Sequence, residues 1–124
     1  MAKKFKKKVP QDSPVEEEFD WQLKDAGIKG YTRNTTFISG RKFRADFWFP
    51  FLRLAVEVDG GVWLGGRGGH TSGRGYQSDR LRDQLATMQG ITTLRFTSAQ
   101  IRDGSALAYL LDYIPIRKGE VNGP

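Results

Sequence analysis

The 124-residue sequence contains no cysteine and a single histidine, His70. Disulfides and thiolate metal sites are therefore excluded, and one histidine cannot build a histidine metal cluster. No apolar run approaches the roughly 20 residues that a membrane-spanning helix needs, and the first residues lack the apolar stretch of a signal peptide. We therefore expect a protein of the cytoplasm that has no membrane partner.

The formal net charge of +6 is unevenly distributed along the chain. Residues 1–10 contain five lysines and no acid, and without these lysines 15 basic residues face 14 acidic ones. They are Lys3, Lys4, Lys6, Lys7 and Lys8. Such a run is typical of a flexible arm attracted to polyanions such as DNA, although lysine tails also improve solubility. We predict a flexible basic tail over residues 1–11, a single domain over 12–116 and a C-terminal tail over 117–124.

Periodicity and capping signals predict both helices and strands. Ser13, Pro14 and Glu16 mark the start of a helix over residues 13–27, with a capping box in its first turn. The predicted strands are 31–38, 41–49, 52–59 and 92–96, and the further helices are 76–89 and 98–114, the last broken near Gly104. The residues expected to face the core from the first two helices are Val15, Phe19, Leu23, Ala26, Leu81, Leu85 and Met88. This order predicts an α/β domain with a central mixed sheet flanked by helices.

A glycine-rich segment separates the third strand from the second helix. Residues 60–75 (GGVWLGGRGGHTSGRG) contain eight of the fifteen glycines. The segment is not a P-loop, because no Gly-Lys-Ser/Thr follows it. Its glycines let backbone N–H groups approach a DNA backbone, while Arg67 and Arg74 neutralise phosphates. His70 is either a phosphate contact or acid–base group, or a plain loop residue.

The stretch RADFWFPFLRLAVEVDGG carries three acids within strand-like sequence. Asp46 and Glu57 lie eleven residues apart across a predicted hairpin, and Glu57 and Asp59 share one face of the second strand. Three converging carboxylates repel one another unless a cation lies between them, and hard oxygen ligands favour Mg²⁺ or Mn²⁺. The alternative interpretation is a solvated strand face on which the acids pair with Arg44 or Arg53, or a simple turn after the strand.

The sequence resembles a known family over most of its body. The order of elements looks like the αβββαβ core of the PD-(D/E)XK nucleases, a restriction-endonuclease-like fold, and RADFWFPFLRLAVEVDGG resembles its catalytic hairpin. The hairpin and the later stretch DRLRDQLATMQGITTLRFT are similar to the branch related to very-short-patch-repair endonucleases. The stretch GGRGGHTSGRG resembles small phage-borne relatives proposed to cut branched DNA.

The resemblance assigns roles to individual positions. Asp46 matches the first metal-binding acid of the family and Glu57 the second. Asp59 stands where the family usually has a catalytic lysine, and it is expected in or near the metal site. Because this departure leaves a positive charge missing, Arg82 or Lys42 is a candidate to supply it.

Glu16 matches a first-helix acid that assists the metal site in related resolvases and nickases. The resemblance therefore implies a catalytic set of Glu16, Asp46, Glu57 and Asp59, the last three holding the metal. The capping box gives Glu16 an alternative, structural role. The residues expected to contact DNA are Lys3, Lys4, Lys6, Lys7, Lys8, Lys42, Arg44, Arg67, His70, Arg74 and Arg82.

We therefore expect a Mg²⁺-dependent DNA endonuclease, with Mn²⁺ as a substitute, that leaves 5′-phosphate and 3′-hydroxyl ends. Resolution of four-way (Holliday) junctions by a homodimer is favoured, because the chain has no room for a separate sequence-reading domain and paired cuts need a twofold dimer. The apolar residues of 106–114 are either core or interface. The alternatives are a mismatch- or site-specific nickase and a non-catalytic DNA-binding module. The resemblance alone implies a phage origin, and hence a host cytoplasm.

Overall fold

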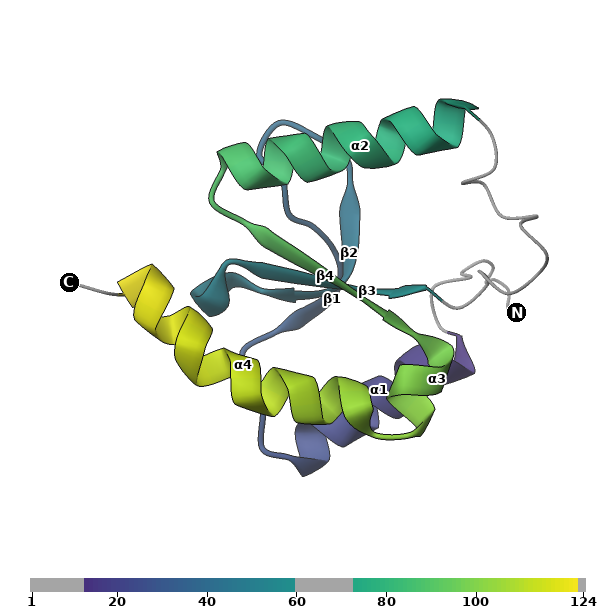
Figure 1. Ribbon diagram of the computed structural model, residues 1–124, viewed down its shortest axis with the longest axis vertical. Helices are drawn as coiled ribbons and strands as arrows, with labels where there is room; N and C mark the ends of the chain where they lie inside the picture. Colours follow the sequence, from purple (N-terminus) through teal and green to yellow (C-terminus); the bar gives the residue numbers. More distant parts are fainter. Residues whose placement is uncertain (1–12, 60–72, 123–124) are drawn as a thin grey trace, which may run out of the picture.

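The computed structural model describes residues 13–59 and 73–122 (Figure 1). In chain order its elements are helix α1 (Pro14–Asp25), strands β1 (Thr32–Thr36) and β2 (Arg44–Phe49), the 3-10 turn η2 (Pro50–Leu52), strand β3 (Leu54–Asp59), helix α2 (Gly73–Met88), strand β4 (Thr92–Thr97) and helices α3 (Ser98–Arg102) and α4 (Ser105–Asn122). The five lysines of residues 1–10, Arg67 and His70 lie outside the described residues, as does the side chain of Arg74.

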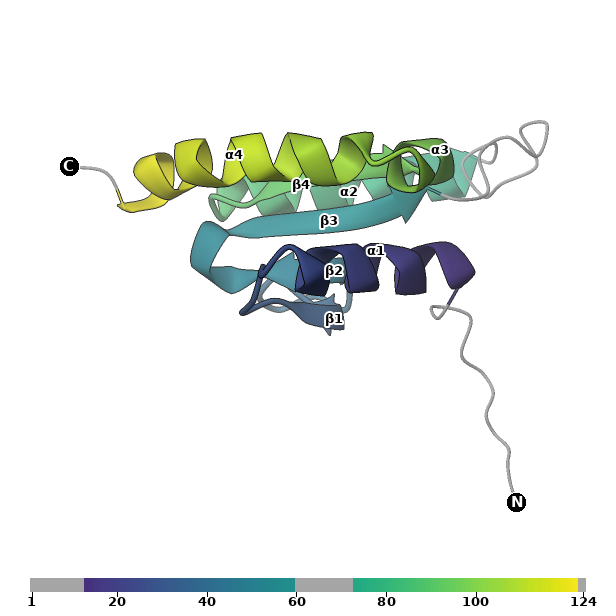
Figure 2. The same ribbon diagram turned by 90° about the horizontal axis from the view of Figure 1, so that it is seen from below.

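The four strands form one mixed sheet in the order β1-β2-β3-β4. The first three strands are antiparallel, and β4 runs parallel to β3. Helix α2 covers one face of the sheet, while α1, α3 and α4 cover the other (Figure 1). Figure 2 shows α1 and α4 lying along that second face on either side of β3. The predicted α/β architecture with a helix-flanked mixed sheet is confirmed.

Most of the core lies between the sheet and the α1/α4 layer. Phe19 of α1 is fully buried and packs edge-to-face against Phe47 of β2, with ring centroids 5.3 Å apart. Leu110 anchors α4 in the same cluster. A smaller cluster lies under α2, which contributes Ala86 and the partly buried Leu85; its other buried members include Ala45, Ala55 and Phe37. The two faces of the sheet therefore differ, because α2 adds few apolar side chains to its face, whereas α1 and α4 add many to the other.

This difference explains an error in the predicted orientation of α2. Leu81 and Met88 were expected in the core, yet they are 37% and 81% exposed. Ala86 is buried instead and Leu85 is partly buried, and the same side of the helix turns Arg82 toward Glu57. In α1, Val15, Phe19 and Leu23 are buried as predicted, whereas Ala26 is exposed at the helix end.

The C-terminal end of α4 also departs from the prediction. Residues 117–122 were expected to form a tail, but α4 continues to Asn122 and passes through Pro115. Arg117 explains this extension, because its guanidinium donates to three backbone carbonyls: Nε to Leu52 at 2.7 Å, and Nη2 to Arg53 at 3.0 Å and Gly90 at 2.9 Å. The end of the helix is thus held against two turns of the domain.

The remaining differences concern the ends of elements. The strand expected over 31–38 is limited to Thr32–Thr36, and the one expected from residue 41 begins at Arg44. The break predicted near Gly104 is present between α3 and α4, where Gly104 has a φ of +86° that favours glycine. Among residues 13–59 and 73–122, no helix has the length and apolar character needed to cross a bilayer.

Candidate functional site

The β2–β3 hairpin brings Asp46 and Glu57 side by side. Phe47 pairs with Val56 in the antiparallel register, and Asp46 and Glu57 are the next residues on their strands, close enough for the charge of Asp46 to raise the pKa of Glu57. The backbone N–H of Val58 donates a hydrogen bond to Asp46 Oδ2 at 2.7 Å, so a side-chain oxygen serves here as the acceptor for the β3 backbone. The two predicted acids are neighbours, as the spacing across the turn indicated.

Two arginines from different elements hold Glu57. Arg82 of α2 places Nη1 3.0 Å from Glu57 Oε1, and the side chains of this pair are only 12% and 14% exposed. Arg95 of β4 is the register partner of Glu57 on the parallel strand and lies 3.6 Å from the same oxygen. Two guanidinium groups therefore contact the same carboxylate oxygen, Glu57 Oε1.

These arginines belong to a wider ionic network on α2. Asp83 accepts from Arg95 at 3.2 Å and lies 3.9 Å from Arg82, while Asp79 lies 3.6 Å from Arg82. The helix phase puts Asp79, Arg82 and Asp83 on the turn that faces the sheet, because residues three and four apart share a helix face. This polar surface replaces the apolar face that the sequence pattern predicted for α2.

Burial dominates the electrostatics of the two acids. It raises the pKa of the Asp46 carboxyl, although the Val58 hydrogen bond and the charges of Arg82 and Arg33 act in the opposite direction. Burial likewise raises the pKa of Glu57, and the nearby Asp46 charge raises it further, against the effect of Arg82 and Arg95. Both carboxylates are thus harder to ionise than in water.

Among the residues that the structure describes, two buried polar atoms in this site have no hydrogen-bond partner: Glu57 Oε2 and Arg82 Nε. A small cavity of about 140 Å³ adjoins them and is lined by Glu57, Val58, Asp59, Asp79, Arg82 and Arg95. Asp59 therefore borders the same space as Glu57, at the end of β3. A buried carboxylate oxygen without a partner is costly unless a cation or a donor reaches it.

The donor set suits a hard cation, because Asp46 and Glu57 offer carboxylate oxygens and the part of the chain that the structure describes offers no cysteine or histidine ligand. Within residues 13–59 and 73–122, however, no three acidic or histidine side chains lie close enough together to form a metal-binding group. The structure thus brings Asp46 and Glu57 together and leaves Asp59 at the border of the cavity. Metal binding by these residues stays a prediction.

Glu16 lies in the first turn of α1 and approaches a different charge. Its Oε1 is 4.0 Å from Arg33 of β1, which also contacts Glu17 at 3.0 Å and Asp20 at 3.7 Å. Ser13 Oγ accepts the Glu16 N–H at 3.2 Å, so the predicted N-cap is confirmed. The positive charge of Arg33 also acts to lower the pKa of Asp46, so the same arginine influences both Glu16 and Asp46. The catalytic role implied for Glu16 stays a prediction.

Two predicted DNA contacts lie away from this site. Lys42 precedes β2 and lines a separate surface depression with Arg41 and Phe43. Arg44 donates to the Asn34 carbonyl at 2.8 Å. Of the two candidates for the missing positive charge, Arg82 forms an ion pair with Glu57, whereas Lys42 lines a separate depression.

Sequence reasoning missed Arg95 and Asp79. Arg95 lies in the Leu-Arg-Phe strand that the family resemblance included, but its partner depends on the parallel register between β3 and β4. Asp79 depends on the phase of α2. A prediction of which strand β4 joins would have located Arg95.

The fold has a counterpart among solved structures. The structure titled "Homing Endonuclease I-Bth0305I Catalytic Domain" superimposes with a TM-score of 0.62 and 14% sequence identity, covering 86% of this chain and 98% of that one. No known protein family and no curated protein sequence matches the chain. At this identity the likeness shows a shared fold, and the chemistry rests on the residues of the site.

Proposed function

We propose that this protein is a metal-dependent DNA endonuclease. The observation that carries the proposal is the partly buried Asp46–Glu57 pair, in which two acids lie on neighbouring strands and one oxygen, Glu57 Oε2, has no hydrogen-bond partner among the described residues. A protein gains little stability from such a pair, since burial penalises both charges. The likeness to a homing endonuclease catalytic domain supports the same class of activity.

In this proposal Asp46 and Glu57 hold a Mg²⁺ or Mn²⁺ ion, with Asp59 at the border of the site. The ion, when bound, supplies Lewis-acid chemistry: it polarises a phosphate oxygen and lowers the pKa of a coordinated water. Arg82 and Arg95 orient Glu57 through their contacts at 3.0 and 3.6 Å and offer positive charge to a phosphate. Arg82 thereby fills the role of the lysine that Asp59 replaces.

We further propose that the substrate is branched DNA, and that the enzyme resolves four-way junctions. Support comes from the described helices and strands, which all belong to one domain around a single sheet and so favour recognition of DNA by its shape. The net charge of +6 favours a polyanionic partner. A nickase acting on mismatched duplex is distinguished by substrate choice in the experiment below.

The test is cleavage of labelled four-way junction, mismatched duplex and plain duplex with Mg²⁺ and with Mn²⁺. Wild type is expected to cut the junction, and Asp46→Asn and Glu57→Gln to lose at least about a thousandfold in rate, because each removes a proposed metal ligand. Asp112→Asn is the matched control, since Asp112 is an exposed acid on α4 far along the chain from the site. Its rate is expected to equal wild type.

A readout independent of turnover is Mn²⁺ binding, followed by electron paramagnetic resonance on the same variants. Wild type and Asp112→Asn are expected to bind the ion, and Asp46→Asn and Glu57→Gln to lose binding. Absence of both cutting and Mn²⁺ binding in wild type would refute the enzymatic proposal. In that case DNA binding without cleavage would favour the non-catalytic module, in which Arg82 and Arg95 replace the cation beside Glu57.

A further inference from the structure

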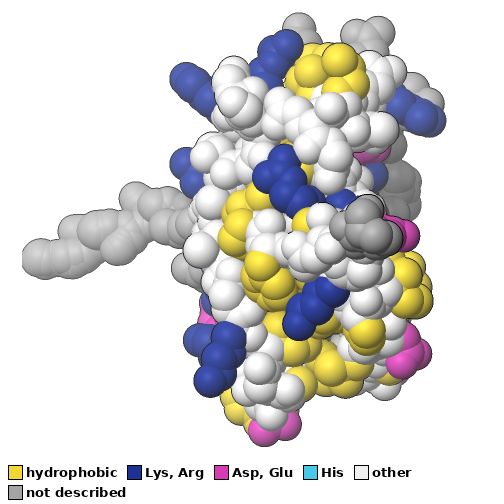
Figure 3. Space-filling model, turned by 90° about the vertical axis from the view of Figure 1, so that its left-hand side faces the viewer, with side chains coloured by type: hydrophobic (Ala, Val, Ile, Leu, Met, Phe, Trp, Pro, Cys, Tyr) yellow, Lys and Arg dark blue, Asp and Glu magenta, His cyan; other side chains and the backbone are white. Residues whose placement is uncertain are grey.

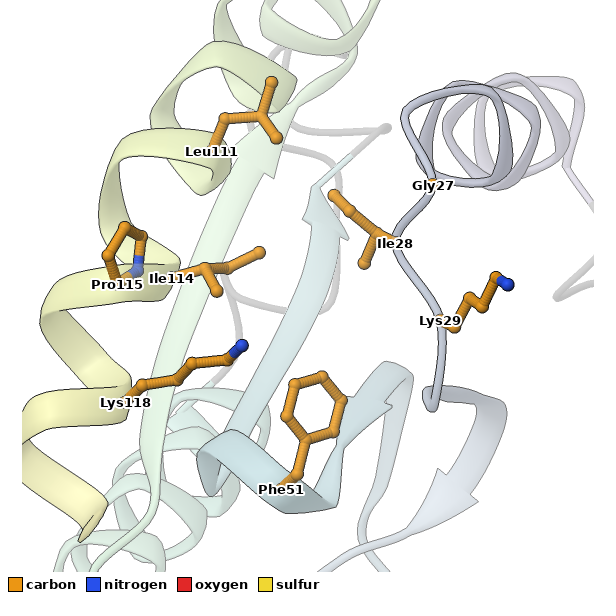
Figure 4. A pocket seen from close by; sticks show the side chains of 8 residues that line it. All are labelled: Gly27, Ile28, Lys29, Phe51, Leu111, Ile114, Pro115 and Lys118. Atoms are coloured by element: carbon orange, nitrogen blue, oxygen red, sulfur yellow. The ribbon is translucent and has the colours of Figure 1, made fainter.

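An apolar groove lies at the opposite end of β3 from the candidate site. It has a volume of about 380 Å³ and runs between α4, the α1–β1 connection and η2 (Figure 4). Its apolar lining includes Ile28, Phe51, Leu111 and Ile114, and Lys29 and Lys118 lie at its sides. Figure 3, which faces this end of the molecule, shows exposed hydrophobic side chains among basic ones.

The groove is incompletely covered in this chain. Phe51 and Leu111 are 40% and 47% exposed, although both line it. Leaving large apolar side chains in water at the edge of a concave surface is unfavourable by roughly 25 cal/mol per Å². The surface is therefore suited to a partner with an apolar side chain and negative charge to meet the two lysines.

Helix α1 carries an exposed apolar side chain, Trp21, with acidic residues around it. Trp21 is 65% exposed, and it lies on the outer side of α1 because Phe19 and Leu23, two residues to either side, are fully buried. Its neighbours one turn away are Glu17, Glu18, Lys24 and Asp25. Lys24 forms an ion pair with Asp20 at 3.0 Å, which leaves the surroundings of Trp21 acidic.

We propose that the groove receives Trp21 of a second copy of this chain. The indole fills the apolar groove, while Glu18 and Asp25 of the partner approach Lys29 and Lys118, so shape and charge are complementary. The knob lies on α1, and the groove is lined in part by Gly27, Ile28 and Lys29, which follow directly after this helix. Two such contacts related by a twofold axis close into a dimer.

Other occupants fit less well. Residues 1–10 carry five lysines, so their charge has the same sign as Lys29 and Lys118. Two facing grooves would likewise bring four lysines together. The contact also leaves the Glu57 end of β3 uncovered, and dimer formation through it does not depend on nuclease activity.

The first test is sedimentation velocity of the full chain over a range of concentrations. Wild type is expected to show a reversible monomer–dimer equilibrium. Trp21→Ala is expected to weaken the dimer at least about a hundredfold, since a buried tryptophan is a typical hot spot and is used twice in a symmetric dimer. Met88→Ala is the matched control, because Met88 is an apolar residue that is 81% exposed on α2. It is expected to leave the equilibrium unchanged.

The second test is a charge exchange. Lys29→Glu with Lys118→Glu, and separately Glu18→Lys with Asp25→Lys, are each expected to weaken the dimer at least tenfold, because each places like charges in contact. Combining all four substitutions is expected to restore it. Circular dichroism melting shows that each variant is folded. Restoration would not follow from a merely structural effect of the individual substitutions.

Three outcomes would overturn the proposal. In the first, wild type stays monomeric at all concentrations. In the second, a dimer forms but is unaffected by Trp21→Ala, which assigns it to another surface. In the third, wild type grows into open polymers, which excludes the reciprocal contact. Cleavage assays on the same samples report separately on the nuclease proposal.

Discussion

Arg117 is predicted to be a main determinant of the stability of the C-terminal half of α4. Its guanidinium makes three hydrogen bonds to backbone carbonyls, at 2.7, 3.0 and 2.9 Å, and its side chain is only 12% exposed. A hydrogen bond from a charged donor contributes about 1.5–3 kcal/mol, but ordering an arginine side chain costs up to about 2 kcal/mol, and water reaches part of the vacated site. We therefore expect Arg117→Ala to cost about 2–4 kcal/mol.

The assay is urea unfolding at one fixed protein concentration, with fluorescence and circular dichroism as probes. Arg117→Lys is expected to lose about half as much as Arg117→Ala, because a lysine keeps the charge but not the planar fork that reaches three carbonyls. Glu120→Ala removes the exposed ion pair with Arg117, 3.1 Å long, and is expected to cost less than about 0.5 kcal/mol. If Arg117→Ala lowers the free energy of unfolding by less than about 0.5 kcal/mol, Arg117 does not have the stabilising role assigned to it.

Three further outcomes are expected. Burial raises the pKa of Asp46 in the folded state above that of an aspartate in the unfolded chain, so the folded state binds the proton more tightly. Metal-free stability therefore falls as pH rises from about 4 through the raised pKa, and Asp46→Asn flattens this slope in melting curves recorded from pH 4 to 8. Arg82→Ala leaves Glu57 with Arg95 alone and costs about 2–3 kcal/mol in urea unfolding at pH 7, and an unchanged midpoint would contradict this. Deleting residues 1–8 removes five lysines, so the slope of log affinity for DNA against log salt falls by up to about 4; an unchanged slope would exclude tail–phosphate contacts.

The hairpin was predictable because its signals are local. Strict alternation in β3 and a proline at the turn set the register, and that register places Asp46 and Glu57 directly after the Phe47–Val56 pair. The N-cap at Ser13 is local in the same sense. Predicting these features requires only the spacing of residues along the chain, so a single sequence was sufficient.

The rest depended on contacts between distant segments. Pro115 and Gly119 are weak helix residues, and the continuation of α4 past them relies on Arg117 reaching carbonyls 64 and 65 positions earlier in the chain. The orientation of α2 was mispredicted because apolar periodicity assumes that the long apolar side chains face the core, whereas this helix buries Ala86 and turns Arg82 toward Glu57. No pattern along one segment contains that information.

Positive charge reaches Glu57 from elements other than its own strand. A lysine two residues after Glu57 would have come from the same strand, whereas here positive charge comes from α2 and β4. Arg82 and Arg95 offset the repulsion between Glu57 and Asp46 in part, yet burial still raises both pKa values, and no described residue donates a hydrogen bond to Glu57 Oε2. Apolar residues of similar volume would be at least as stable in these positions. The carboxylate pair is therefore best explained by what binds to it, and a cation at Glu57 Oε2 would lower both pKa values and satisfy the unpaired oxygen together.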